Sequence, residues 1–213
     1  MNNFNINRLK YNPIIVMIGP RRCGKTLLIK SILAQDDSIK DILVITPTDK
    51  YNGSSLYDYN ENQIQNINIE FPDLHNLLTS YINNKPNDKK CLIFEDSCFF
   101  TSNKYKDPQI INLLSDANKF NTMIIMTTQY PYYLPLEIHN MINYYFLFYW
   151  DFESNNIRLF NIFKTKFTYL EHFKTLFKNF TGNEWHHPMI LDNHTNEIFG
   201  YQTPNTEWFG WTA

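Results

Sequence analysis

The stretch "IGPRRCGKTLLI", from Ile18 to Ile29, decides the fold of this 213-residue chain. Within it, residues 19–26 match the pattern G-x-x-x-x-G-K-[ST], with the apolar run "IIVM" before the match and an apolar helical pattern after it. A glycine-rich turn between a buried strand and a helix presents backbone N–H groups and the helix N-terminus to a phosphate chain. The motif in this context predicts a nucleoside triphosphate as the ligand.

Different residue types in the turn hold different parts of the triphosphate. The two glycines let the backbone wrap around the phosphates, Lys25 brings a positive charge to the β- and γ-phosphates, and the Thr26 hydroxyl can ligate Mg²⁺. We therefore predict ATP and Mg²⁺ as cofactors. The alternative is a chance glycine turn before a structural helix. The predicted nucleotide-binding residues are Gly19, Arg21, Arg22, Cys23, Gly24, Lys25 and Thr26.

Two acids follow a second apolar run in the segment "KKCLIFEDS". Glu95 and Asp96 thus stand where a parallel strand ends, at the same sheet edge as the glycine-rich turn. Because adjacent strand residues point to opposite sides, one acid can face the metal while the other faces the attacking water. We predict Glu95 as a Mg²⁺ ligand and Asp96 as the base that polarises water. The alternative is a pair of solvated acids with no catalytic role.

A glutamine ends a third apolar run, in the segment "MIIMTTQYP". Gln129 is expected at the same edge, where its amide can hydrogen-bond the γ-phosphate or the attacking water without adding charge. Taken alone, a glutamine at a strand end is often only a polar residue that closes the strand. The predicted catalytic set is Lys25, Glu95, Asp96 and Gln129.

Apolar runs alternate with helical patterns along most of the chain. Uninterrupted apolarity is typical of strands covered on both faces, and the alternation favours a three-layer α/β fold with a mostly parallel sheet. After Trp150 the pattern predicts two amphipathic helices and a short hairpin. We predict a single domain over residues 1–213, with a core at about 12–150 and an extension at about 151–213. The expected strands are 14–18, 42–46, 91–94, 123–127 and 144–149, and the expected core helices are 25–34, 73–83 and 108–118.

The overall composition narrows the class of protein. With 43% hydrophobic residues, a net charge of -2 and a pI near 6.3, the chain lacks the basic character of a protein that coats nucleic acid. Its three cysteines form no C-x-x-C pair, so we expect neither a disulfide nor a zinc site. No run approaches about 18 apolar residues, so we expect a soluble intracellular protein without membrane insertion.

The motifs "IGPRRCGKT", "CLIFEDS" and "MIIMTTQYPYYLPLEIHNMINYYFLF" together resemble those of the FtsK–HerA superfamily of DNA-pumping ATPases, and within it the genome-packaging ATPases of large DNA viruses and virophages. The resemblance covers roughly residues 12–149. It implies a P-loop NTPase fold of the RecA/FtsK type in which the Gln129 strand lies between the other two. It also implies an ATP-driven translocase that packages double-stranded DNA into a viral capsid. Such a protein would form a homo-oligomeric ring, contact capsid or portal proteins, and be found in the host cytoplasm (viral factory) or in the virion.

The chain departs from the family pattern in two places. Glu95 precedes Asp96, whereas the family usually has Asp before Glu, so the identity of the base stays open. The segment "LEIHNMI" has His139 where family members often carry an arginine. This matters because an arginine from a neighbouring subunit can raise the rate about 10³- to 10⁵-fold. Arg158 and Arg21 are the candidates here, the alternative being exposed arginines without this role.

Lysines in loops are candidates for contact with DNA phosphates. One group is Lys85 with Lys89 and Lys90, and a second group, Lys104 and Lys106, follows the acidic strand. A ring would multiply their charge around a duplex, although a lysine run is more often a solvated face. An alternative function is a small P-loop kinase for nucleosides or nucleotides. "IGPRRCGKT" also resembles the opening of thymidine kinases, but this chain lacks their four-cysteine zinc element. A structural subunit that binds ATP only to order its ring is a further alternative.

Overall fold

The computed structural model describes residues 3–46, 64–68, 74–84, 87–95, 106–131, 136–182 and 187–201. They form one eight-stranded sheet in the order β3-β2-β4-β5-β1-β6-β7-β8. The first six strands in this order, β3, β2, β4, β5, β1 and β6, run parallel. β7 pairs antiparallel with β6, and β8 pairs antiparallel with β7. The strands are β1 (Ile14–Ile18), β2 (Ile39–Thr46), β3 (Ile64–Asn68), β4 (Lys89–Phe94), β5 (Thr122–Thr128), β6 (Tyr144–Leu147), β7 (Met189–Asp192) and β8 (Ile198–Gly200).

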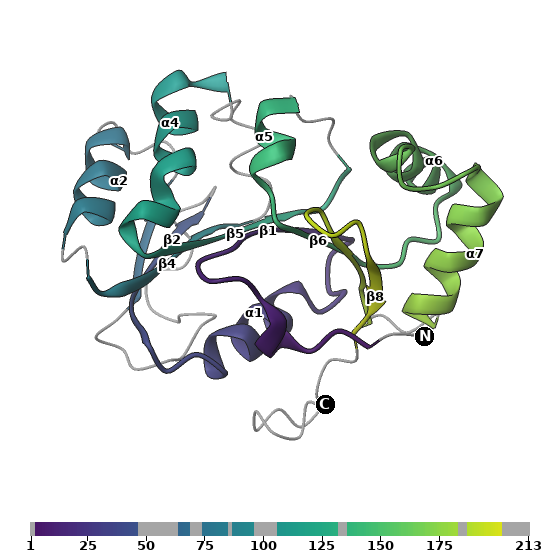
Figure 1. Cartoon of the computed structure of the whole chain (residues 1–213), viewed down its shortest axis with the longest axis horizontal. Helices are drawn as coiled ribbons and strands as arrows, with labels where there is room; N and C mark the ends of the chain where they lie inside the picture. Colours follow the sequence, from purple (N-terminus) through teal and green to yellow (C-terminus); the bar gives the residue numbers. More distant parts are fainter. Residues whose placement is uncertain are drawn as a thin grey trace.

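Helices cover both faces of this sheet (Figure 1). α1 lies on one face, α2, α4 and α5 lie on the other, and α6 and α7 pack together beside β6 and β8. Among the described helices, none combines the length and the apolarity that a membrane span requires. The helices are α1 (Lys25–Ala34), α2 (Leu74–Asn83), α4 (Pro108–Asp116), α5 (Leu136–Met141), α6 (Glu153–Phe163) and α7 (Leu170–Thr181), with short 3-10 helices at Ile6–Arg8 and Ala117–Phe120.

Alternate side chains of the strands enter two separate cores. In β1, Val16 and Ile18 pack with α2, α4 and α5, whereas Ile15 and Met17 pack with α1. Every residue of β1 is buried. A strand buried on both faces needs apolar residues at consecutive positions, which is the reason for the continuous apolar runs in the sequence. The predicted three-layer α/β fold with C-terminal helices and a hairpin is confirmed.

Besides the short 3-10 helices, the described residues contain a strand and a helix that the sequence patterns did not predict, and β6 is shorter than predicted. β3 pairs with β2 at the sheet edge, and its sequence "IQNIN" is too polar to resemble the other strands. α5 has six residues, too few to establish a helical period. β6 ends at Leu147, two residues before the predicted end, although the Phe148 amide still donates a hydrogen bond to the Ile18 carbonyl of β1 at 2.9 Å.

Candidate nucleotide-binding site

The loop between β1 and α1 begins with a glycine that has no room for a side chain. The Gly19 amide donates a hydrogen bond to the Thr128 carbonyl of β5, with 3.0 Å between the nitrogen and the oxygen. A Cβ atom at this position would lie 2.6 Å from Phe148 Cβ and 2.7 Å from Cys23 Sγ. Both distances are shorter than van der Waals contact, and a backbone-bound Cβ cannot move aside. The first glycine of the motif is thus required by the close approach of β1, β5 and the residue after β6.

Left-handed backbone turns lead the loop into the helix. Arg22 has φ 62° and Gly24 has φ 95°. Gly24 caps α1, and its carbonyl accepts the first helical hydrogen bond from the Leu28 amide at 2.9 Å. Such local turns bring successive N–H groups to one concave side of the chain, which suits a phosphate. The free N–H groups of the first turn of α1, where Thr26 lies half-buried, point the same way.

The ammonium group of Lys25 lies inside the loop. Its side chain is buried, and Nζ donates hydrogen bonds to the carbonyls of Gly19 at 2.8 Å and Pro20 at 2.7 Å. A third, longer contact of 3.8 Å joins it to Cys23 Sγ. Burial raises the pKa of the Cys23 thiol, although Lys25 acts in the opposite direction. Cys23 is therefore a neutral thiol packed beneath the loop, and only its backbone is available to a ligand.

The carboxyl ends of three neighbouring strands meet beside the loop. β5 lies between β1 and β4, with Met17 paired to Thr127 and Phe94 paired to Met126. The Glu95 amide continues the ladder by donating to the Ile45 carbonyl at 2.9 Å. Glu95 therefore stands level with Thr127, one residue beyond Phe94.

Strand alternation places Glu95 on the α1 side of the sheet. Cys91 and Ile93 of β4 belong to the core beneath α1, and Leu28 of α1 packs in the same core. Glu95 is the next residue of that alternation and is buried. This carboxylate thus extends from the strand end on the face that also carries Lys25.

A side-chain hydrogen bond joins the loop to the end of β5. Nε of Arg21 donates to Oε1 of Gln129 at 3.0 Å. Gln129 follows directly after β5 and is half-buried, whereas Arg21 is exposed. This contact was not foreseen from the sequence, because 108 positions separate the two residues and no local pattern connects them.

Comparison with known proteins identifies the fold. The genome-packaging NTPase B204 of Sulfolobus turreted icosahedral virus 2, in complex with AMP, superposes with a TM-score of 0.67 over 92% of this chain and 100% of B204, at 16% identity. The chain has the fold of this packaging NTPase. The resemblance inferred from the sequence motifs is thereby confirmed at the level of the fold, including the position of the Gln129 strand between the other two.

Two further relatives extend the comparison. The pCW3 conjugation coupling protein TcpA, with ATPγS, gives a TM-score of 0.59 at 10% identity over 92% of this chain and 62% of TcpA. In sequence, the chain is 26% identical over 202 residues to the uncharacterized protein L437 of Acanthamoeba polyphaga mimivirus, covering 89% of this chain and 70% of L437. No family model matches.

On the packaging-NTPase fold, the remaining predicted residues have different locations. Arg22 is exposed in the loop, and Lys106 is exposed just before α4. The prediction of a DNA contact is wrong for Lys90, which is buried with Nζ donating to the Ile82 carbonyl at 2.8 Å, and Lys89 is paired with Asp36. Arg158 is exposed on α6, beyond β6 and to the side of the sheet (Figure 1). Lys85, Asp96 and Lys104 lie outside the described residues. The structure thus brings together Lys25, Glu95 and the Arg21–Gln129 pair, all at the carboxyl ends of β1, β4 and β5.

Proposed function

We propose that this protein is an ATP hydrolase that translocates double-stranded DNA and packages a viral genome into its capsid. The observation that carries the proposal is the order β4-β5-β1, which gathers Glu95, Gln129 and the Lys25 loop at one sheet edge. The fold shared with the packaging NTPase B204 supports the choice of reaction. In open α/β sheets, ligands bind at the carboxyl ends of the strands, which is the edge formed here.

The loop fits a polyphosphate in shape and charge. Gly19 packs too closely for any side chain, and the Lys25 ammonium already lies inside the loop. To bind a β- or γ-phosphate, it has only to exchange a carbonyl for a phosphate oxygen, which forms a stronger charge-assisted hydrogen bond. Thr26 and Glu95 would hold Mg²⁺, which supplies positive charge beside the β- and γ-phosphates.

Three side chains would act on the γ-phosphate and the attacking water. Asp96 is proposed as the base that orients and polarises the water, with Glu95 as the other possible base. Gln129 would hydrogen-bond the γ-phosphate or the water from the end of β5. Arg21 binds Gln129 through one Nε–H donor, so its other guanidinium donors remain suited to phosphate. A phosphate that attracted Arg21 would change the position of Gln129, which would connect nucleotide binding to the strand end.

The motor role requires further partners. We propose a homo-oligomeric ring around DNA, with Lys104 and Lys106 on the DNA phosphates, and contacts to capsid or portal proteins in the viral factory or the virion. The net charge of -2 is compatible with this arrangement because a ring gathers local lysines at its centre. Replacing both lysines by glutamine should flatten the salt dependence of DNA binding. An unchanged slope would exclude them from the DNA path.

The proposal is tested by ATP hydrolysis with and without double-stranded DNA. We expect the wild-type protein to be stimulated by DNA and Lys25→Ala to be inactive in both conditions. Lys178→Ala, which removes an exposed lysine from α7, serves as the matched control and should behave as wild type. ATP binding should stabilise the wild-type fold by roughly 2.7 kcal/mol at a hundredfold excess over the dissociation constant.

Two other results would contradict the motor. Transfer of phosphate from ATP to a nucleoside or nucleotide, without DNA stimulation, would identify a P-loop kinase. Tight ATP binding without turnover, in the presence and absence of DNA, would identify a structural subunit that uses ATP only to order its assembly. One chromatographic assay distinguishes these results, because it separates ADP and any phosphorylated nucleoside or nucleotide from unreacted ATP.

A further inference from the structure

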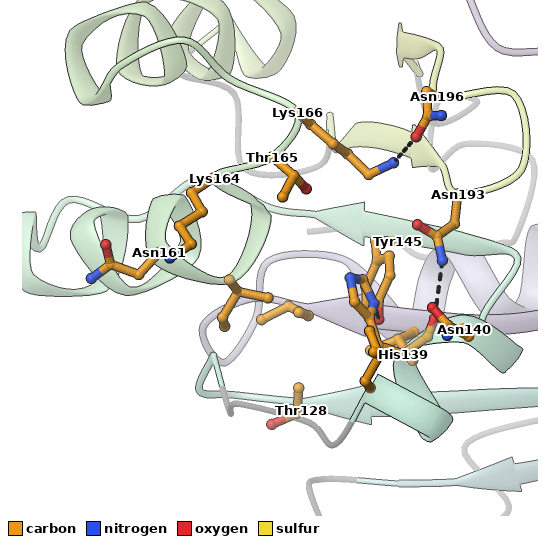
Figure 2. A pocket seen from close by; sticks show the side chains of 14 residues that line it. Thr128, His139, Asn140, Tyr145, Asn161, Lys164, Thr165, Lys166, Asn193 and Asn196 are labelled. Carbon is orange, nitrogen blue, oxygen red and sulfur yellow. Dashed lines mark hydrogen bonds between the residues drawn. The ribbon is translucent and has the colours of Figure 1, made fainter.

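A cavity lined by both apolar and polar side chains lies on the sheet face opposite to α1. Its volume is about 380 Å³, and its floor is formed by Val16 and Ile18 of β1 and Thr128 of β5. These are the side chains that alternate with Met17 and Thr127, which face α1. The cavity and the nucleotide loop thus use opposite faces of the same two strands. Its walls are α5, the end of α6 with the loop that follows, and the turn between β7 and β8 (Figure 2).

Positive groups and amides line the cavity. Lys164 and Lys166 come from the loop after α6, and His139 of α5 lies across from them together with Tyr145 of β6 (Figure 2). No carboxylate occurs among the lining residues that the structure describes. A cavity with two lysines and no acid favours an anion. Four asparagines complete the polar lining: Asn140, Asn161, Asn193 and Asn196.

Hydrogen bonds hold several of these side chains in place. Asn193 Nδ2 donates to the carbonyls of His139 and Ile142, each at 3.0 Å, and fixes the hairpin turn to the end of α5. Lys166 Nζ donates to Asn196 Oδ1 at 2.5 Å. The buried Tyr145 hydroxyl is hydrogen-bonded to His139 Nδ1, and their rings meet edge-on with centroids 5.3 Å apart. The cavity is therefore pre-formed by side chains from three separate parts of the chain.

Burial in this cavity disfavours the protonated forms of His139 and Lys166. Burial, with the charge of Lys166, lowers the pKa of His139. Burial also lowers the pKa of Lys166, although the Asp192 carboxylate acts in the opposite direction. Oδ1 of that carboxylate is engaged by the amides of His194 at 2.8 Å and Thr195 at 3.0 Å in the hairpin turn. An anion in the cavity would stabilise the positive charge of Lys166, because the Asp192 carboxylate that acts on Lys166 already accepts two backbone hydrogen bonds.

We propose that this cavity binds a phosphate monoester of mononucleotide size, with Lys166 on the phosphate, the exposed Lys164 at the cavity edge and asparagine side chains around the remainder. Its volume falls within the range of small-molecule sites, about 300–1,000 Å³. Lysine ammonium groups bind phosphate as point charges, and amides both donate to and accept from the edge of a base. This is a second anion site, separated from the nucleotide loop by β1 and β5.

The test follows the His139 imidazole resonances of the full chain by NMR during titration with AMP. The protein carries Lys25→Ala, so that the nucleotide loop does not compete, and His139→Gln assigns the signals. We expect a saturable shift at AMP concentrations up to about 10 mM. Titrations with inorganic phosphate and with a dinucleoside monophosphate, a phosphate diester, show whether the cavity needs the nucleoside and whether it prefers a monoester. Binding of the diester as tightly as AMP would point to a nucleic-acid backbone and would overturn the monoester assignment.

Two lysine variants test the cavity itself. Lys164→Gln combined with Lys166→Gln should weaken AMP binding by at least about tenfold, and Lys178→Gln on α7 should leave it unchanged. Should the double variant lose its fold, Lys164→Gln alone serves, because Lys164 is exposed and should still weaken binding measurably. The proposal is overturned by the absence of any saturable shift, or by a shift that persists unchanged in the lysine variants. Because the loop is disabled throughout, failure here leaves the ATPase proposal intact.

Discussion

The two faces of β1 and β5 carry two proposed anion sites of opposite construction. On the α1 face, the groups come from consecutive residues: a glycine without space for a side chain, a left-handed turn and a lysine held by loop carbonyls. On the other face, the groups come from α5, the loop after α6 and the β7–β8 turn, which are far apart in the sequence. The first site is built mainly from backbone, and the second from side chains.

This difference teaches what each site tolerates. A closely packed loop is destabilised when a single atom is added at Gly19, because Phe148 Cβ is attached to the backbone and cannot move aside. A cavity lined by separate side chains accepts many single changes and loses affinity gradually. The following experiments test the contrast, from the largest expected effect to the smallest.

Removing the buried acid on the α1 face should have the largest effect. Glu95→Gln keeps the shape of the side chain and removes its charge, so the rate of ATP hydrolysis should fall by at least about a hundredfold. Glu137→Gln changes an exposed acid on α5, on the opposite face, and should leave the rate unchanged. Steady-state phosphate release measures both. Equal rates for Glu95→Gln and wild type would show that Glu95 takes no part in ATP hydrolysis.

Adding one methyl group to the loop should reduce stability more than the same change at the hairpin. Gly19→Ala places Cβ 2.6 Å from Phe148 Cβ, so the free energy of unfolding should fall by about 1–3 kcal/mol. Gly200→Ala is the matched control, because there Cβ would meet the Phe180 ring at 3.0 Å and a ring edge can shift. Urea denaturation measures both. Similar losses at the two glycines would contradict the contrast between rigid loop and adaptable surroundings.

Alanine variants of the exposed Arg21 and Arg158 distinguish an arginine that acts within its own subunit from one that acts on a neighbouring subunit. Arg21→Ala removes the hydrogen bond to Gln129 and should lower DNA-stimulated hydrolysis by about tenfold. Arg158→Ala should have a comparable or larger effect only if α6 supplies an arginine to a neighbouring subunit. Lys178→Ala is the control for loss of an exposed helical cation. If both arginine variants retain full activity, neither position provides the trans-acting arginine.

The smallest effect concerns His139 in the side-chain cavity. Its pKa lies below the ordinary value of 6.5, mainly through burial and also through Lys166. As the pH falls below about 6.5, the unfolded chain binds more protons at this position than the folded chain, so acid lowers stability. We expect the free energy of unfolding of wild type to decrease more steeply than that of His139→Gln between about pH 7 and pH 5.5. Lys178→Gln, which changes an exposed residue of α7 that does not titrate in this pH range, should retain the wild-type slope.

Local sequence was sufficient to predict the helices and strands whose characteristic patterns lie within a few consecutive residues. The helix predicted at 25–34 is α1, residue for residue, because Gly24 begins it and the apolar spacing continues to its end. The central strands were recognisable because burial on both faces demands consecutive apolar residues. The edge strand β3 and the six-residue α5 were missed, since pairing with β2 and packing on the sheet stabilise them rather than any local pattern.

By itself, the sequence predicted the glycine-rich loop between β1 and α1 as a nucleotide site, because its glycines and lysine lie close together in the chain. It also placed Glu95 and Gln129 at strand ends, although their roles stay predictions. Only the tertiary structure decided which strands are neighbours, which brings Arg21 to Gln129 across 108 positions. It alone assembled the cavity of Lys164, Lys166 and His139. The physical reason is that strand order and side-chain convergence depend on packing between distant segments, and such packing leaves no periodic signal in the chain.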